Sequence, residues 1–193
     1  MENFQRIASG LDVAPLLNAI WGQPELWKQI VARQLTPGSP HKDTETIFLR
    51  WAEKLTVEDV FTAIPAVDYP ALDRLPEAKS LISQIMSKVG SNELGRVIIT
   101  KLRPGGSIDT HADEGAYADH YERFHLALTA DGGAWFTSYL DADRAETVRM
   151  WPGELYWFHH KREHTYVNCG DTDRIHLIVD CVAPLFRRER DAA

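Results

Sequence analysis

Two histidines and one aspartate in the C-terminal half of the chain have side chains that could together bind a metal ion. His111 and Asp113 are separated by one residue, and His164 follows far downstream. Two histidines with one carboxylate are the ligand set of a non-haem Fe(II) facial triad, which leaves metal positions open for substrate and oxygen. The three residue types therefore indicate an oxygenase, provided that the fold brings them together.

The spacing of the first pair predicts a chelate on one strand. His111 and Asp113 fall in the β-prone segment Ile108–Asp113, and residues i and i+2 of a strand point to the same face. His164 opens a later β-prone segment, and a double-sheet jelly roll can bring distant strand ends together. An alternative helical metal pair, His160 with His164, is disfavoured because a Pro-Gly turn and an aromatic run precede it.

Arg174 follows His164 in the next expected strand and could hold an acidic co-substrate. In a buried pocket only a carboxylate partner would repay the desolvation of a guanidinium, whose planar shape matches a carboxylate bidentately. The alternative is an arginine that ends a strand at the surface.

The predicted secondary structure around these residues changes from helices to strands along the chain. The first part predicts helices at Leu11–Ile20, after Pro24 and at Pro76–Lys88, which Gly90 ends, with a strand at Thr46–Trp51. From Arg96 onward, short strands alternate with turns. They are Val97–Leu102, Ile108–Asp113, Arg123–Thr129, Ala134–Leu140, Thr147–Met150, Glu154–Phe158, His164–Asn168 and Arg174–Val182.

These patterns predict an α+β fold, in which a double-stranded β-helix (a cupin-like jelly roll) follows a helical N-terminal region. The length of 193 residues suits a single domain, 1–193. Within it we expect a mainly helical part, 1–92, packing on the barrel, a jelly-roll core, 93–184, and a charged tail, 185–193.

Composition restricts the classes of function. The net charge of −7, from 21 basic and 28 acidic residues, argues against a nucleic-acid binder. Cys169 and Cys181 form no CxxC pair, so a redox or zinc motif is not expected. No apolar leader or run of membrane-spanning length is seen, so we expect no membrane partner and a cytoplasmic location. The oligomeric state is left open.

Several segments together resemble the 2-oxoglutarate/Fe(II)-dependent dioxygenases, in particular the aspartyl/asparaginyl β-hydroxylase type. The resemblance covers Arg96 to Pro184, and Gly38 to Arg50 is weakly similar to bacterial members. The segments are Lys101-Leu102-Arg103-Pro104-Gly105-Gly106, His111-Ala112-Asp113, Arg123-Phe124-His125-Leu126, Trp151-Pro152-Gly153-Glu154, Glu163-His164 and Arg174-Ile175-His176-Leu177-Ile178-Val179-Asp180.

The resemblance implies Fe(II) and 2-oxoglutarate as cofactors and gives roles to individual residues. His111, Asp113 and His164 match the iron ligands, and Arg174 matches the arginine that binds the distal carboxylate of 2-oxoglutarate. A basic pair and a hydroxyl residue match further co-substrate contacts. These are Arg123, His125 and Thr100.

Two positions depart from the resemblance. Asp113 completes a triad that the animal β-hydroxylases of peptides lack, which makes the chain more similar to bacterial relatives, including the cis-proline hydroxylases. His176 stands where an apolar residue is common, so it either tunes the pocket or touches substrate. His125 has an alternative role in the core, because its strand places Phe124, Leu126 and Leu128 on the opposite face.

Candidate substrate contacts follow from position alone. They are Arg50, His176, Trp135 and Tyr117. Trp157 is a second candidate, with Trp135, for the wall of an apolar barrel pocket. The segment 114–122, which contains Tyr117, follows the metal pair directly and is interpreted as a loop that closes over the site. His41 and His120 fall in expected loops and are interpreted as solvated.

The predicted reaction is hydroxylation of an unactivated C–H bond, with release of succinate and carbon dioxide. The substrate is a small molecule or a peptide: a free amino acid, an Asp or Asn residue in a peptide, or a related compound. Two alternatives remain at this point. One is a cupin-like metal enzyme that uses no dioxygen, and the other is a non-catalytic β-sandwich binding module.

Overall fold

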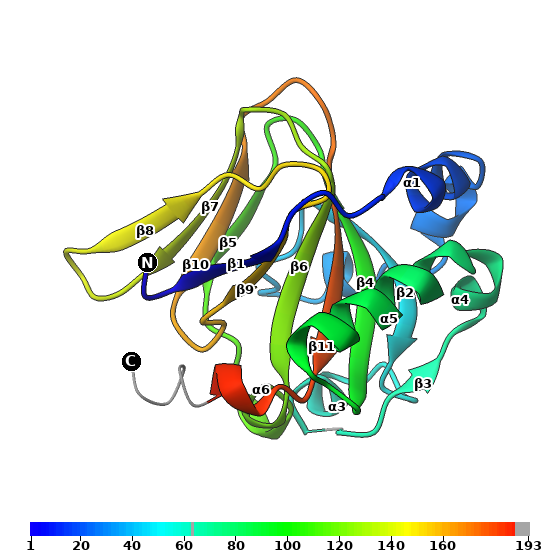
Figure 1. Cartoon of the computed structure of the whole chain (residues 1–193), viewed down its shortest axis with the longest axis horizontal. Coiled ribbons are helices and arrows are strands. Elements are labelled where there is room, and N and C mark those ends of the chain that lie inside the picture. Colours follow the sequence, from blue (N-terminus) through cyan, green and yellow to red (C-terminus); the bar gives the residue numbers. More distant parts are fainter. Residues whose placement is uncertain (63, 188–193) are drawn as a thin grey trace.

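Two antiparallel β-sheets lie face to face in the computed structural model, which describes residues 1–62 and 64–187 (Figure 1). The larger sheet has seven strands in the order β1-β9-β6-β11-β4-β2-β3, and the smaller has four in the order β5-β10-β7-β8. Side chains of both sheets meet in one apolar cluster, as in a jelly roll. The strands are β1 (Phe4–Ala8), β2 (Thr44–Trp51), β3 (Val67–Asp68), β4 (Leu94–Leu102), β5 (Ser107–His111), β6 (Glu122–Thr129), β7 (Ala134–Tyr139), β8 (Ala145–Val148), β9 (Leu155–Phe158), β10 (His164–Asn168) and β11 (Arg174–Cys181).

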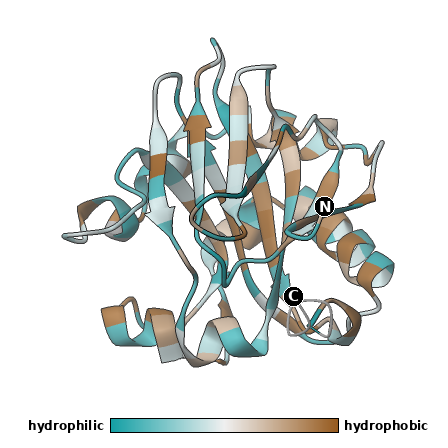
Figure 2. Ribbon diagram, turned by 90° about the vertical axis from the view of Figure 1, so that its left-hand side faces the viewer, coloured by the Kyte–Doolittle hydropathy of each residue, from teal (hydrophilic) through white to brown (hydrophobic). Residues whose placement is uncertain are grey.

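Helices cover the outer face of the larger sheet, where a second and larger apolar core forms (Figures 1 and 2). Most of the helices lie in the N-terminal half, and α6 follows β5. The helices are α1 (Ala14–Trp21), the 3-10 helix η1 (Pro24–Lys28), α2 (Ala32–Leu35), α3 (Val57–Thr62), α4 (Pro70–Arg74), α5 (Glu77–Val89) and α6 (Gly115–His120).

The helix α5 shows how the sequence builds this outer layer. Its apolar residues recur at helical spacing, and Leu81, Ile82, Ile85 and Val89 are buried against the sheet. Full burial of each such side chain contributes roughly 1.5–3 kcal/mol. Gly90 ends the helix in the left-handed conformation, with φ 67°, which glycine adopts without steric cost. The helix predicted to stop at Gly90 is therefore confirmed.

The central strand β11 separates the two cores. Ile175, Leu177 and Val179 pack into the helix-covered core, and the alternate residues therefore point to the space between the sheets. Those alternate residues are Arg174, His176, Ile178 and Asp180, and all of them are buried. A strand that is buried on both faces thus carries polar side chains only on the face that looks into the jelly roll.

The sequence predicted the strands of the C-terminal half within one or two residues at most ends, and the α+β jelly roll is confirmed. The strand β1 was missed because its exposed residues break the apolar pattern, and it is held by pairing with β9. Pairing of β2 with β4 places part of segment 1–92 inside the larger sheet instead of on top of it. The division into 1–92 and 93–184 stays a prediction.

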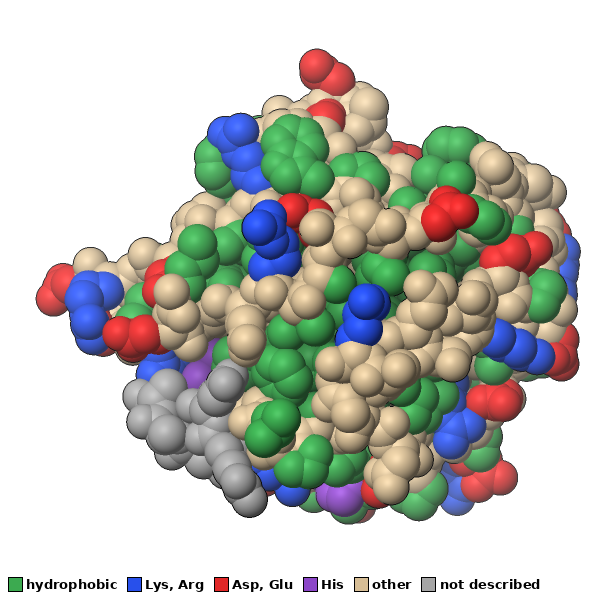
Figure 3. Space-filling model, viewed as in Figure 1, with side chains coloured by type: hydrophobic (Ala, Val, Ile, Leu, Met, Phe, Trp, Pro, Cys, Tyr) green, Lys and Arg blue, Asp and Glu red, His purple; other side chains and the backbone are tan. Residues whose placement is uncertain are grey.

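The surface, the cysteines and the C-terminal tail show no further feature that bears on the predicted function within the described residues. Acidic and basic side chains are interspersed on the face in Figure 3. No helix in the described ranges has the length and apolar character that a membrane crossing requires. Cys169 is exposed, Cys181 is buried, and both thiols are free. From residue 188 onward, the expected tail, 185–193, lies outside the described residues.

Candidate metal centre and its pocket

His111, Asp113 and His164 lie together at one end of the smaller sheet. Each offers one ligand atom, and these atoms all lie within 4.8 Å of one another. His111 is the last residue of β5 and pairs directly with His164, the first residue of β10, so that their ring centroids are 4.4 Å apart. Antiparallel pairing of two strand ends therefore brings the distant histidine to the first one.

The expectation that His111 and Asp113 share one strand face is wrong in its geometry. The strand β5 ends at His111, because its partner β10 begins opposite that residue. Asp113 lies beyond the strand and is held by its own N–H, which donates to the carbonyl of His160 at 2.9 Å. Its Oδ1 is nevertheless 4.0 Å from Nε2 of His111. A turn after the strand places the carboxylate in this position.

Backbone carbonyls fix the tautomer of both histidines. Nδ1 of His111 lies 2.8 Å from the carbonyl of Asp109, and Nδ1 of His164 lies 2.8 Å from the carbonyl of Arg162. Because a carbonyl oxygen only accepts, each Nδ1 carries the proton and donates it, which leaves the Nε2 lone pair available. This arrangement is typical of metal-binding histidines, whose second nitrogen is oriented by a hydrogen bond.

The protonation states also suit a metal site. Burial lowers the pKa of His111 and lowers the pKa of His164 to about 4, so both rings are neutral at neutral pH. Burial alone would raise the pKa of Asp113, but the positive charge of Arg123 outweighs it and holds the pKa below its usual range. The centre thus presents two neutral imidazoles and one carboxylate.

A pocket between the sheets opens beside this centre, and all four predicted co-substrate residues line it. Arg174 and Thr100 line it together with Arg123 and His125. Arg174 is only 1% exposed, its guanidinium lies 3.8 Å above the ring of Tyr166, and its Nη2 donates to Nδ1 of His176 at 2.7 Å. His176 therefore holds Arg174 from the neighbouring position on the same face of β11.

Several buried polar atoms around this pocket have no hydrogen-bond partner within the described ranges. The co-substrate residues contribute Nε and Nη1 of Arg174, Oγ1 of Thr100 and Nε2 of His125. Leaving a buried donor or acceptor unpaired costs about 1–3 kcal/mol, and such groups are rare in folded proteins. Two unpaired N–H donors on one buried guanidinium fit a carboxylate.

Arg123 lies in the pocket but is already paired with two carboxylates. Its Nη1 donates to Oδ2 of Asp113 at 2.5 Å, while Nε and Nη2 bind Asp180 at 2.8 and 2.9 Å. The resemblance implied a co-substrate contact for this residue, and that role stays a prediction. The contacts that the structure gives are to Asp113 and Asp180.

Three candidate substrate residues point elsewhere. Arg50, on β2, forms an ion pair at 2.6 Å with Asp68 on the edge strand β3. Trp135 lies on the outer face of β7, where the guanidinium of Arg149 stacks on it at 3.7 Å. Trp157 is buried in the helix-covered core. The idea that these tryptophans wall the pocket is wrong, because the alternation of their strands turns both side chains away from it.

Tyr117 belongs to the helix α6 and not to a loop over the site. The residue is 4% exposed, and its hydroxyl accepts from the N–H of Arg96 at 2.7 Å and donates to Asp180 at 3.1 Å. Segment 114–122 was interpreted as an irregular lid because its polar residues follow the metal pair. The buried tyrosine instead anchors the helix to β4 and β11.

Two pocket residues were missed by the sequence. Arg33, in α2, and His41, in the segment that follows, both line the pocket. The ring centroid of His41 is 5.0 Å from that of His111, so the interpretation of His41 as solvated is wrong. Proline and glycine around His41 correctly indicated a loop, but no local pattern shows that this loop packs across a distant strand end.

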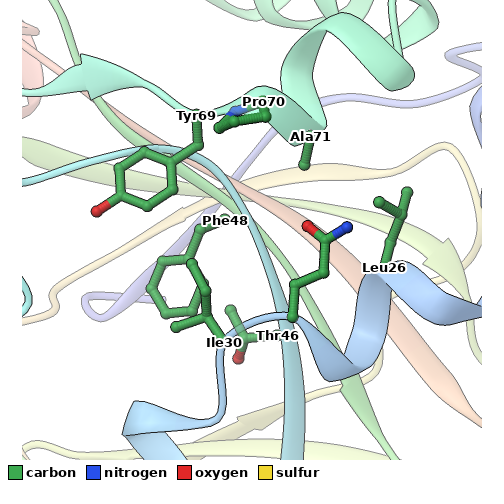
Figure 4. A pocket seen from close by; sticks show the side chains of 8 residues that line it. Leu26, Ile30, Thr46, Phe48, Tyr69, Pro70 and Ala71 are labelled. Carbon is green, nitrogen blue, oxygen red and sulfur yellow. The ribbon is translucent and has the colours of Figure 1, made fainter.

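A second pocket lies beside β2 and is mostly apolar (Figure 4). Its side chains come from η1 and the residues after it, from β2 and from the start of α4. They are Leu26, Gln29, Ile30, Thr46, Phe48, Tyr69, Pro70 and Ala71. None of these side chains is an acid, a base or a metal ligand of the usual kinds, so the chemistry lies in the first pocket.

Known proteins share features of this sequence and of this fold. The family model for Aspartyl/Asparaginyl beta-hydroxylase matches residues 36–184. The comparison with curated protein sequences found no match.

Among solved structures, a Burkholderia pseudomallei oxidoreductase of the 2OG-Fe(II) oxygenase family is similar, with a TM-score of 0.57 and 11% identity over 72% of this chain and 68% of that one. A Pseudomonas putida prolyl-4-hydroxylase has a TM-score of 0.53 and 13% identity over 93% and 92% of the two chains. The non-haem α-ketoglutarate-dependent epimerase SnoN of nogalamycin biosynthesis has a TM-score of 0.57 and 13% identity over 93% and 77%. At these identities the likeness shows the fold.

Proposed function

The chain belongs to the aspartyl/asparaginyl β-hydroxylase family, and from this premise we propose that it hydroxylates an unactivated C–H bond with Fe(II) and 2-oxoglutarate. In this proposal His111, Asp113 and His164 hold the iron. The balanced reaction converts substrate, 2-oxoglutarate and dioxygen into hydroxylated substrate, succinate and carbon dioxide. The substrate is an amino acid, an Asp or Asn residue in a peptide, or a related small molecule.

One observation carries the proposal: the three candidate ligand atoms lie within 4.8 Å of one another, and the same pocket holds a buried arginine with two unpaired donors. Three protein ligands of this kind leave positions open on an iron ion. Bound iron with 2-oxoglutarate supplies the oxidising power when dioxygen is present, and the protein supplies ligation, orientation and a site shielded from water.

Arg174 would bind the distal carboxylate of 2-oxoglutarate. Its Nε and Nη1 are unpaired and buried, while Nη2 is held by His176 and the plane rests on Tyr166. A guanidinium that is fixed at one nitrogen and on one face presents its remaining donors in one orientation, which favours bidentate binding of a carboxylate. Thr100 and His125 face the same space and would complete the contacts to the co-substrate.

The rival functions explain these features less well. A metal enzyme that uses no 2-oxoglutarate has no need for a buried arginine with unpaired donors next to the metal. A binding module without metal would leave two histidines with fixed tautomers and free Nε2 atoms facing one carboxylate.

The proposal is tested first by metal and co-substrate binding. We expect the unmodified chain to bind one Fe(II) under anaerobic conditions and then 2-oxoglutarate, both measured by calorimetry. Asp113→Ala should lose metal binding, whereas the matched change Asp143→Ala, at an exposed aspartate in the β7–β8 turn, should not alter it. Equal metal affinity in all three proteins would overturn the assignment of the triad.

Succinate release then tests the reaction. With Fe(II), 2-oxoglutarate and a panel of amino acids and peptides, we expect stimulation of succinate formation by the substrate and loss of that stimulation in Asp113→Ala. A chain that binds Fe(II) but not 2-oxoglutarate would favour the metal enzyme that uses no dioxygen.

A further inference from the structure

Arg33 and His41 reach the metal pocket from outside the strands that carry the proposed iron and 2-oxoglutarate contacts. Both line the pocket, and Arg33 lies before residue 36, where the match to the family model begins. Neither has a part in the proposed function. Their position next to the centre therefore requires a separate explanation.

The segment that carries them is attached to the strand that ends in His111. The N–H of Asp109 donates to the carbonyl of Pro40 at 3.0 Å, and the N–H of Ser107 donates to Oδ2 of Asp43 at 3.1 Å. These contacts bracket His41 on both sides. His41 and the metal centre are thus held by the same stretch of β5.

Each of the two side chains carries a polar atom that is enclosed without a partner. These are Nη1 of Arg33 and Nδ1 of His41, for which the described part of the chain provides no hydrogen bond. A guanidinium N–H that is removed from water and left unpaired costs more than a neutral one, because it is charged. A ligand that accepts hydrogen bonds at this place would remove the cost.

The local charges favour an anion at Arg33. Burial, and after it the nearby charge of Arg123, lowers the pKa of Arg33 to about 10, so the guanidinium stays charged at neutral pH in an unfavourable environment. The two carboxylates in reach, Asp113 and Asp180, are already bound by Arg123. Among the residues that the structure describes, no carboxylate is therefore left for Arg33 alone.

Arg33 and Arg174 act on different parts of the pocket. The charges that act on Arg33 include Asp113 and Asp180, whereas Arg174 contacts Tyr166 and His176. Arg174 and Asp180 are six residues apart on β11, which is about 20 Å along a strand. Arg174, at one end of the strand, suits the co-substrate. Arg33 is then available to bind the substrate.

We propose that Arg33, assisted by His41, binds a carboxylate of the substrate, so that the substrate of this hydroxylase is a carboxylic acid whose acid group is free. The inference rests on the proposed function and narrows its substrate class. In this proposal Arg33 determines substrate specificity, while Arg174 binds the co-substrate.

The test compares a carboxylate with its neutral isostere. The protein is loaded with Zn(II), which has no redox chemistry, and with saturating 2-oxoglutarate. Dissociation constants for acetate and acetamide are then measured by thermal stabilisation at constant ionic strength. The variants are Arg33→Gln, Arg33→Lys and, as an exposed control in the β7–β8 turn, Arg144→Gln.

We expect acetate to bind the unmodified chain and Arg144→Gln about 10- to 100-fold more tightly than acetamide, as the loss of a charge-assisted hydrogen bond predicts. Arg33→Gln should remove this preference, and Arg33→Lys, which keeps the charge, should retain part of it. The affinity for 2-oxoglutarate should stay within about threefold in both variants.

Two results would overturn the inference. One is equal binding of acetate and acetamide by the unmodified chain. The other is a loss of 2-oxoglutarate affinity in Arg33→Gln with the acetate preference intact, which would place Arg33 in the co-substrate site. Failure of the unmodified chain to bind 2-oxoglutarate would instead contradict the proposed function, so the two failures are distinguishable.

Discussion

Arg123 donates from Nη1 to Oδ2 of Asp113 at 2.5 Å, while Oδ1 of the same carboxylate faces Nε2 of His111 at 4.0 Å. The arginine thus occupies one oxygen of the carboxylate and leaves the other toward the candidate metal position. Asp180 holds the opposite edge of the guanidinium through two hydrogen bonds. The buried Asp180 therefore positions Asp113 through Arg123, as outer residues of metal sites commonly orient a ligand.

The first prediction concerns this chain of contacts. Arg123→Gln should weaken metal binding about 10- to 100-fold, because the carboxylate loses the group that orients it. Calorimetric titration with Fe(II) under anaerobic conditions measures the effect. Arg149→Gln, at an exposed arginine directly after β8, serves as the control. Unchanged metal affinity with weaker 2-oxoglutarate binding would instead support the co-substrate role that the family resemblance implies.

The second prediction concerns Arg174. Arg174→Gln should weaken 2-oxoglutarate binding about 10- to 100-fold, since hydrogen bonds to charged groups contribute roughly 1.5–3 kcal/mol. Arg174→Lys should recover only part of the loss, because an ammonium cannot bind a carboxylate bidentately. The measurement is 2-oxoglutarate titration into Zn(II)-loaded protein. Metal affinity is the internal control, and a parallel loss of metal would point to damage of the fold.

The third prediction concerns His176, which accepts a hydrogen bond from Arg174. His176→Leu should remove the acceptor for Nη2 of Arg174 and weaken 2-oxoglutarate binding by about 1–3 kcal/mol, the cost of an unpaired buried donor. His176→Asn keeps an acceptor and should restore part of the affinity. If the leucine variant binds 2-oxoglutarate as well as the unmodified chain, then His176 does not position Arg174.

The fourth prediction concerns acid stability without metal. Burial lowers the pKa of His125 and of His176 well below the ordinary value of 6.5. Between their folded pKa values and 6.5, the unfolded chain binds more protons, so the free energy of unfolding falls as the pH falls below 6.5. Each group contributes about 1.4 kcal/mol per pH unit in that range.

Urea unfolding of the metal-free chain at pH 7.0 and 5.5 checks this expectation. The double variant His125→Phe, His176→Leu should lose less stability between the two pH values than the unmodified chain. His120→Gln, at a partly exposed histidine on α6, should show the unmodified dependence. An equal loss in all three proteins would show that other groups control acid unfolding.

Local patterns sufficed for much of the fold. Turn residues such as Pro104-Gly105 and Pro152-Gly153 separate the strands, and Gly90 ends α5, because these residues restrict the backbone locally. The strand β1 lacked such a signal, since its stability comes from pairing with β9. The helix α6 was missed for a similar reason, because the contacts of Tyr117 come from distant strands.

The available chemistry could be predicted from the sequence alone: two histidines, an aspartate and an arginine, in an order that is similar to that of one family. Residue types and short spacings are local properties, so they can be read along the chain. Which side chains meet depends on the three-dimensional fold. It placed His164 opposite His111 by strand register, and it brought Arg33 and His41 into the pocket from a remote segment. It also turned Trp135 away and placed Asp113 beyond its strand, because pairing partners and buried contacts come from residues far apart in sequence.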